Sequence, residues 1–116
     1  MARYLISFPS SAMDHIPGEE RPAVGEAAHA VVRAAIDADV WVFGGGLAEN
    51  VEPVMAAGDG TITAGTYPQT NELDGGFAVV DVPSREAALE WAAKIAAACR
   101  CAQEIREFMP DPAVGN

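Results

Sequence analysis

The chain has few basic residues and no long apolar run, and each shortage excludes a class of partner. Seven Lys and Arg residues face seventeen Asp and Glu, so the 116 residues carry a formal net charge of -10. A surface of this kind repels nucleic acid and anionic lipid, and we expect neither as a partner. No stretch approaches the roughly 18 apolar residues of a membrane span, and MARYLISF turns polar too soon for a signal peptide. We therefore expect a cytoplasmic protein.

Cysteine is scarce as well, which argues against a metal site. The two cysteines, Cys99 and Cys101, lie two positions apart, and no second pair is present to complete a zinc site. The Gly44–Gly46 triplet is followed by an acidic stretch that lacks the lysine of a phosphate-binding loop. We expect the cysteines to fill space, and we expect no metal or other cofactor.

The clearest pattern lies in the C-terminal third of the sequence, which reads as strand, helix, strand. The β-branched run Phe77–Val82 predicts a strand, and Ser84 is a good N-cap for the helix that follows. Between Arg85 and Ala98 there is no glycine or proline, and apolar residues recur at helical spacing. A last strand is predicted over about 101–108.

The first half of the chain predicts a second unit of the same kind. Alternating side chains indicate a strand over Arg3–Phe8, and three prolines indicate a long surface loop over Pro9–Pro22. An amphipathic helix is predicted over Ala23–Asp37, and a short strand over Val40–Phe43 that the glycine triplet Gly44–Gly46 ends. This strand, helix, strand unit matches the C-terminal one.

Between the two units the sequence predicts a hairpin arm. Gly58-Asp59-Gly60 is a turn signal, and the segment Thr61–Tyr67 contains enough Thr and Ile for a strand. The element order indicates one α+β domain over residues 1–110 with a ferredoxin-like βαββαβ fold and an inserted hairpin arm. Residues 111–116 are expected to form a loose C-terminal tail.

The two faces of such a sheet differ in composition. One carries an unbroken apolar set that can receive both helices: Tyr4, Ile6, Phe8, Ala78, Val80 and Val82. The other mixes apolar and charged residues: Leu5, Ser7, Phe77, Val79, Asp81, Glu104, Arg106 and Phe108. Asp81 needs a partner such as Arg3 or Arg106. The second face is too apolar to be left in water, so we expect a homodimer in which two such faces enclose a partly polar cavity.

The sequence resembles the YCII-related family, in particular the branch known for a DGPF motif. The resemblance rests on WVFGGGL, on GGFAVVDVPSREAALEWAAK, and on EIR at 104–106. It implies a dimeric α+β barrel of ferredoxin-like subunits. The motif itself is degraded, because Ala64-Gly65-Thr66-Tyr67 stands where the family has Asp-Gly-Pro-Phe, although Thr70 and Glu72 follow as in the family.

The resemblance also suggests candidate site residues. In YCII proteins a histidine at the start of the first helix is paired with an aspartate, and His29 falls close to that place. The matching aspartate is open among Asp37, Asp39 and Asp81, and we take Asp81 as the candidate. The pocket between the paired sheets is expected to be lined by Ser7, Phe77, Val79, Glu104, Arg106 and Tyr67.

Two functions fit these expectations. The first is a homodimer that binds a small organic ligand and acts as an accessory or regulatory protein. The second is a small-molecule enzyme of the isomerase, lyase or hydrolase type that uses His29 and a carboxylate for proton transfer without metal. Loss of the motif aspartate favours the first. Replacing His29 by Ala separates the two.

Overall fold

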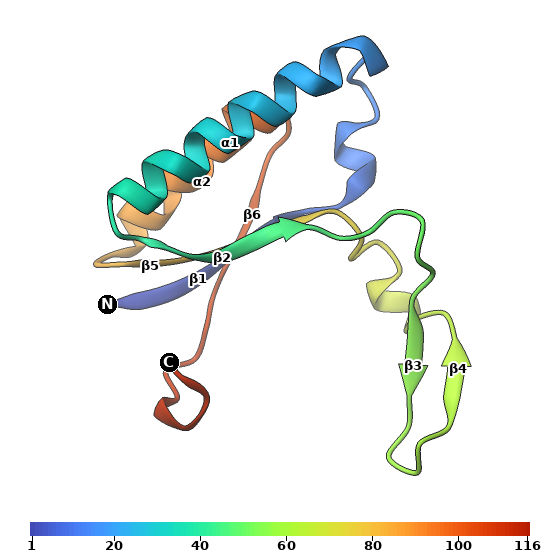
Figure 1. Cartoon of the computed structure of the whole chain (residues 1–116). Helices are drawn as coiled ribbons and strands as arrows, with labels where there is room; N and C mark the ends of the chain where they lie inside the picture. The colour runs from blue at the N-terminus through green and yellow to red at the C-terminus, as the bar shows by residue number, and fades with distance from the viewer.

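Two helices cover one face of a four-stranded antiparallel sheet in the computed structural model, which describes residues 1–116 (Figure 1). The strand order is β2-β5-β1-β6. The elements of this layer pair are β1 (Ala2–Phe8), α1 (Arg21–Asp37), β2 (Trp41–Gly46), β5 (Gly76–Val82), α2 (Arg85–Cys99) and β6 (Glu104–Glu107). The arrangement is the ferredoxin-like α+β fold that the element order predicts.

The strand, helix, strand unit at the C-terminal end forms as its local signals indicate. Alternate residues of β5 are buried, which fits a strand with one face on the core. The Ser84 side chain accepts a hydrogen bond from the backbone N–H of Ala87 at 3.1 Å and so caps α2. The helix ends at Arg100, whose left-handed φ of 59° turns the chain back toward the sheet.

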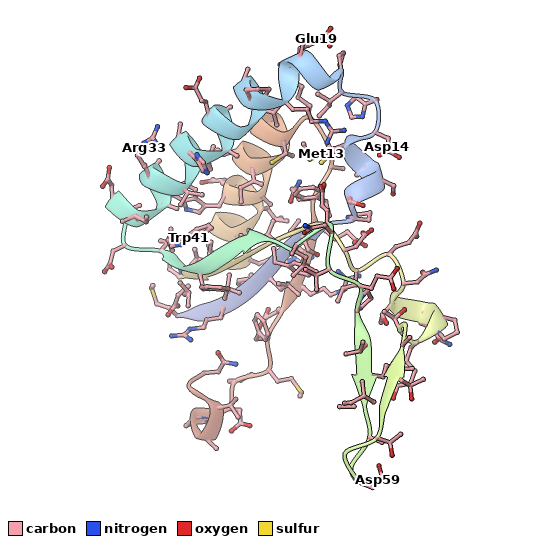
Figure 2. The ribbon with its side chains drawn as sticks, turned by 45° about the vertical axis from the view of Figure 1, so that its right-hand side comes forward. Met13, Asp14, Glu19, Arg33, Trp41 and Asp59 are labelled. Carbon is pink, nitrogen blue, oxygen red and sulfur yellow. The ribbon has the colours of Figure 1, made fainter.

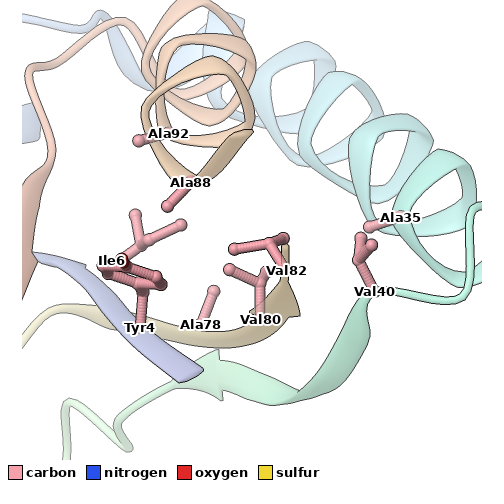
Figure 3. Packing of buried hydrophobic residues seen from close by; sticks show 9 residues of the cluster. All are labelled: Tyr4, Ile6, Ala35, Val40, Ala78, Val80, Val82, Ala88 and Ala92. Carbon is pink, nitrogen blue, oxygen red and sulfur yellow. The ribbon is translucent and has the colours of Figure 1, made fainter. Parts of the chain in front are cut away.

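The core lies between the helices and the sheet (Figure 3). Ala88 and Ala92 of α2 point toward Ile6 and the β5 valines, and their small side chains let the helix approach the strands closely. The predicted apolar face is therefore confirmed as the helix-covered face. The buried cluster consists of Tyr4, Ile6, Ala35, Val40, Ala78, Val80, Val82, Ala88 and Ala92.

The opposite face of the sheet, here called the open face, carries no helix (Figure 1). Its cross-strand pairs are Arg3 with Asp81, Leu5 with Val79 and Arg106, and Ser7 with Phe77 and Glu104. The Arg3 Nε to Asp81 Oδ2 distance is 3.6 Å, so Asp81 has one of its two predicted partners. The other oxygen, Oδ1, is buried and has no hydrogen-bond partner in the single chain.

The inserted segment forms a separate two-stranded sheet, here called the arm, of β3 (Val54–Ala56) and β4 (Ile62–Ala64). It projects from the sheet on the side away from the helices (Figure 1). Its turn is closed by Gly60, which has a φ of +90°, and by the Asp59 carboxylate, which accepts a hydrogen bond from the N–H of Thr61 at 2.9 Å. The hairpin prediction is confirmed.

The Pro9–Pro22 segment differs from the predicted loop. It contains two short 3-10 helices, Ser10–Met13 and Gly18–Glu20, and α1 already begins at Arg21, two residues before the predicted start. Pro22 does not prevent this start, because a proline in the first helical turn gives up no intrahelical hydrogen bond.

Two strand boundaries also differ from prediction. The glycine triplet does not end β2 but forms its second half, paired with β5. Gly44 is required there, since a Cβ would come within 2.6 Å of both the Phe77 carbonyl oxygen and the Trp41 ring. The last strand is shorter than expected and leaves Phe108 outside it.

The C-terminal residues close into a small turn. The N–H of Asp111 donates to the carbonyl of Asn116, and the N–H of Asn116 donates back, at 3.0 and 2.9 Å. A short 3-10 helix, Pro112–Val114, lies between them. Neither α1 nor α2 combines the length and the apolar character that a membrane crossing requires.

Candidate functional site

A cavity of about 320 Å³ lies between the helices and one end of the sheet. Its volume is at the lower limit of typical small-molecule sites. The strands provide the floor and the helices the roof, and the 3-10 segment after β1 forms part of the rim. The central lining residues are Ile6, Phe8, Trp41, Gly46, Gly76 and Ala78 from the sheet, with Ala28, His29, Val32, Ile95 and Cys99 from the helices.

The cavity exists because the residues on the helix-covered face become smaller from one end of β5 and β2 to the other. Tyr4 and Val80 are paired residues near one end of β1 and β5, and Trp41 of β2 is registered with Val80. These large side chains belong to the core or pack against it. Toward the other end the β5 and β2 partners become Ala78 with Gly44 and then Gly76 with Gly46. Glycine and alanine cannot fill the space below the helices, so the layers separate over a hollow.

Three of the glycines at this end are explained by packing within the chain. A Cβ at Gly75 would lie 2.0 Å from the Phe8 carbonyl oxygen, and one at Gly76 would lie 2.7 Å from the Phe8 ring. Gly44 is held by Trp41 as described above. Gly45 and Gly46 are different: a Cβ at either position would meet nothing within 4 Å, and neither has a positive φ. No contact within the chain requires glycine at position 46, which is exposed at the cavity and is paired with Gly76 of its floor.

A clamp between Ser10 and Asp74 holds the rim of the cavity together. The Ser10 backbone N–H donates to Asp74 Oδ1 at 3.1 Å, and its hydroxyl donates to Oδ2 at 2.8 Å. The backbone hydrogen bond, followed by the hydroxyl one, lowers the pKa of the Asp74 carboxyl below its ordinary value. The clamp ties the segment after β1 to the segment that enters β5, so Asp74 is an anchored anion at neutral pH.

Arg21 supplies the one guanidinium of the rim. It lies at the first position of α1, and its Nη2 donates to the carbonyl oxygen of Met13 at 2.9 Å. The cavity adjoins an open groove that shares Ser10, Arg21, Leu47, Glu49 and Asp74 with it and adds Asp14 and Glu52. The entrance therefore has four carboxylates and one guanidinium, which gives it a net negative charge.

The structure places His29 at the cavity but does not bring it together with Asp81. His29 projects from α1 on the helix side of the sheet, is solvent-exposed, and takes part in none of the ion pairs of the chain. Asp81 lies on the open face beside Arg3. Asp37 and Asp39, the other aspartates considered, do not line the cavity. The aspartate that shares the cavity with His29 is Asp74.

Most of the expected pocket residues lie on the open face of the sheet and not in this cavity. Ser7, Phe77, Val79, Glu104 and Arg106 belong to the open face by their strand pairing, and Phe77 also borders the cavity. Tyr67 is 68% exposed and lies between the arm and β5. The cavity described here thus adds residues that the sequence analysis did not select, namely Ser10, Arg21, Gly46 and Asp74. One sequence signal pointed to this end of the sheet. The run Asp74-Gly75-Gly76 leads into the predicted strand Phe77–Val82, which is predicted to share a sheet with Val40–Phe43, the strand followed by Gly44–Gly46.

Both cysteine thiols are free, and Cys99 borders the cavity. Burial, and to a smaller extent the neighbouring Cys101, raises the pKa of the Cys99 thiol, so it is a poor nucleophile at neutral pH. No group of three or more His, Cys, Asp or Glu side chains is arranged to hold a metal ion.

A four-stranded antiparallel sheet with this strand order, two helices on one face and an apolar hollow beneath them defines a ferredoxin-like α+β protein. The family model of the YCII-related domain matches residues 4–110, which is nearly the whole chain, and the protein belongs to the YCII-related family. This confirms the family suggested by the sequence. No curated protein shows significant similarity to the chain.

Proposed function

We propose that the protein is a homodimeric binding protein that holds a small, mainly apolar organic molecule in the cavity between its helices and its sheet. The observation that carries the proposal is the cavity floor. Gly46 stands in a strand, where glycine is unfavourable, and nothing within the chain occupies the space above it. Empty space over a glycine that packing does not require is what a ligand site needs. The apolar lining suits the body of the molecule, and the polar rim would orient it.

The open face supports the dimer. Phe43 is 72% exposed there, and Val79 and Leu5 lie on a face without covering helices. Two open faces packed together would also enclose a partly polar space lined mainly by Val79, Glu104 and Arg106, since Ser7 is only 5% exposed in the single chain. That space is the alternative ligand site.

Binding can be tested with the variant Gly46→Leu, which places an apolar side chain at the cavity, and whose Cβ would meet nothing within 4 Å. Benzylamine, benzyl alcohol and benzoic acid are suitable probes because each has an apolar ring and one polar group. We expect at least one of them to shift the NMR signals of Val32, Ile95 and the Trp41 indole. The shifts should disappear in Gly46→Leu.

The matched control is Gly25→Leu, which places the same side chain in open space on α1 away from the cavity. This variant should bind the probes as the unchanged protein does. Binding that survives in Gly46→Leu with signals moving on the open face instead would assign the ligand to the space between the sheets. If none of the probes moves either set of signals, the binding proposal fails.

An enzyme is the second candidate, because His29 and Asp74 line the same cavity. The lowered pKa of Asp74 means that it carries no proton near neutral pH, so His29 would be the group that transfers one. The distinguishing experiment is His29→Ala, with a compound that binds the cavity followed over time by NMR. Turnover that stops in this variant while the compound still binds favours the enzyme. No turnover in either protein favours the binding function.

A further inference from the structure

We propose that the arm is a docking element that packs the apolar side of its two-stranded sheet against the second copy of the chain. This inference rests on the proposed homodimer and adds to it a second contact, separate from the open face. The arm makes its backbone pairing only within itself and extends away from the helix and sheet layers (Figures 1 and 2). Figure 2 shows Asp59 at its far end, remote from Trp41 and the helices.

One side of the arm is apolar throughout. Val54 is paired with Ala64 and Ala56 with Ile62, and these four side chains share a face because strand residues alternate between faces. The other face carries the pair Met55 and Thr63. Val54 and Ile62 are each 60% exposed, whereas Met55, on the other face, is half-buried. The apolar side of the arm is therefore its uncovered side.

The turn and the base of the arm are fixed by particular residues, although the arm pairs with no strand of the main sheet. Isolated two-stranded hairpins are only marginally stable in water. Here the turn is fixed by Gly60, and the base by Gly65, whose φ is +96° and whose N–H donates to the Pro53 carbonyl at 3.0 Å. Such a hairpin gains the stability it lacks when its apolar face is buried by another surface.

The position of the arm points to a second copy as that surface. The arm projects on the side of the sheet that has no helices, so a copy that covers the open face meets the arm as well (Figure 1). Residues 47–75, which contain the arm, include five acidic residues and no Lys, Arg or His. On the open face Arg3 is paired with Asp81 and Arg106 with Glu104, so these charges cancel. A face without net charge does not repel the acidic arm, and its apolar side chains can pack against the apolar side of the arm.

The test compares two arm variants by sedimentation equilibrium of the full chain. Val54→Thr with Ile62→Thr makes the apolar face polar while keeping two β-branched residues, and Met55→Thr changes the other face. We expect the double variant to raise the dimer dissociation constant on the order of tenfold or more. Met55→Thr should leave it within about twofold of the unchanged chain. Circular dichroism of each variant checks that the helix and sheet layers still form.

The outcomes separate this inference from the proposed homodimer. A chain that sediments as a monomer at all concentrations overturns both. A dimer whose dissociation constant is unaffected by the double variant overturns the docking role of the arm and leaves the homodimer standing. Equal weakening by Met55→Thr overturns the assignment of the docking face.

A photo-crosslinking residue introduced at Ile62 gives an independent readout. It should produce a covalent dimer whose crosslinked peptide comes from the second copy. Crosslinks confined to the same chain, or none in a sample shown to be dimeric, contradict the inference. Crosslinking to a different added protein but not to a second copy would likewise contradict it.

Discussion

The two ends of the helix and sheet layers are built from the same elements, but one end is tightly packed and the other is hollow. At one end Tyr4, Val80 and Val82 meet Ala35 and Ala88, and all five are buried (Figure 3). At the other end β5 and β2 carry only alanine and glycine on this face, and a cavity of about 320 Å³ lies between the layers. The backbone pairing continues through both ends without interruption of β1 and β5. The small residues of β5 and β2 therefore distinguish the hollow end from the packed end, while the large side chains of Ile6, Phe8 and Trp41 form its walls.

The comparison shows how the site depends on the fold. Large side chains at the packed end hold α2 against the sheet, and this support allows small residues further along the same strands. An exposed loop would collapse onto such a hollow, but two packed helices hold it open. The packed end should thus be sensitive to loss of volume, and the hollow end to gain of volume.

The largest effect is expected for Ile6→Ala. Ile6 is 1% exposed and lies where the core and the cavity meet, so the substitution removes buried volume that surrounding residues cannot recover. We expect a loss of about 2 to 5 kcal/mol in the free energy of unfolding. Denaturant titration at fixed protein concentration measures it. Leu89→Ala, at a partly exposed position on the outer side of α2, is the control and should cost far less.

A smaller loss of stability is expected from adding a methyl group at the hollow end, and its cause is a steric clash and not a lost contact. In Gly75→Ala the new Cβ would lie 2.0 Å from the Phe8 carbonyl oxygen, which is backbone and cannot move aside cheaply. A destabilisation of roughly 1 to 3 kcal/mol is expected. Gly46→Ala adds the same group over open space and should leave stability unchanged or slightly raised. Equal melting temperatures for the two variants would refute the distinction drawn between these glycines.

Much of the fold could be predicted because its signals are local. The Ser84 cap, the β-branched run of β5 and the apolar alternation of β1 each act within a few residues, and each appears in the structure as expected. The extension of β2 through its glycines could not be predicted in this way. It depends on Trp41 and on the Phe77 carbonyl of the neighbouring strand, which makes it a tertiary effect.

The site was less predictable than the fold for a related reason. Sequence alternation puts Asp81 on the face opposite the helices, and His29 lies in a helix, so the pairing suggested by the family resemblance did not agree with the predicted sheet. The Ser10 and Asp74 clamp joins residues 64 positions apart, and neither belongs to a helix or strand of the main layers. Contacts of that range leave no periodic trace in a sequence.

The smallest expected effect concerns the pH dependence of that clamp. Asp74 has its pKa lowered by the Ser10 N–H and hydroxyl, below the ordinary 3.8, so the clamp is complete above that value. It is lost as pH falls through the lowered pKa, because protonation removes the charge that both donors stabilise.

Carboxyl NMR should show Asp74 titrating below 3.8, with the Ser10 amide losing exchange protection over the same range. In Ser10→Ala the hydroxyl donor is gone and the backbone donor remains, so the midpoint should rise part of the way. Asp59, whose pKa is lowered by Thr61 at the tip of the arm, serves as the internal control and should not move. If the titration midpoint of Asp74 is the same in Ser10→Ala as in the unchanged chain, the hydroxyl contributes nothing to holding the cavity rim.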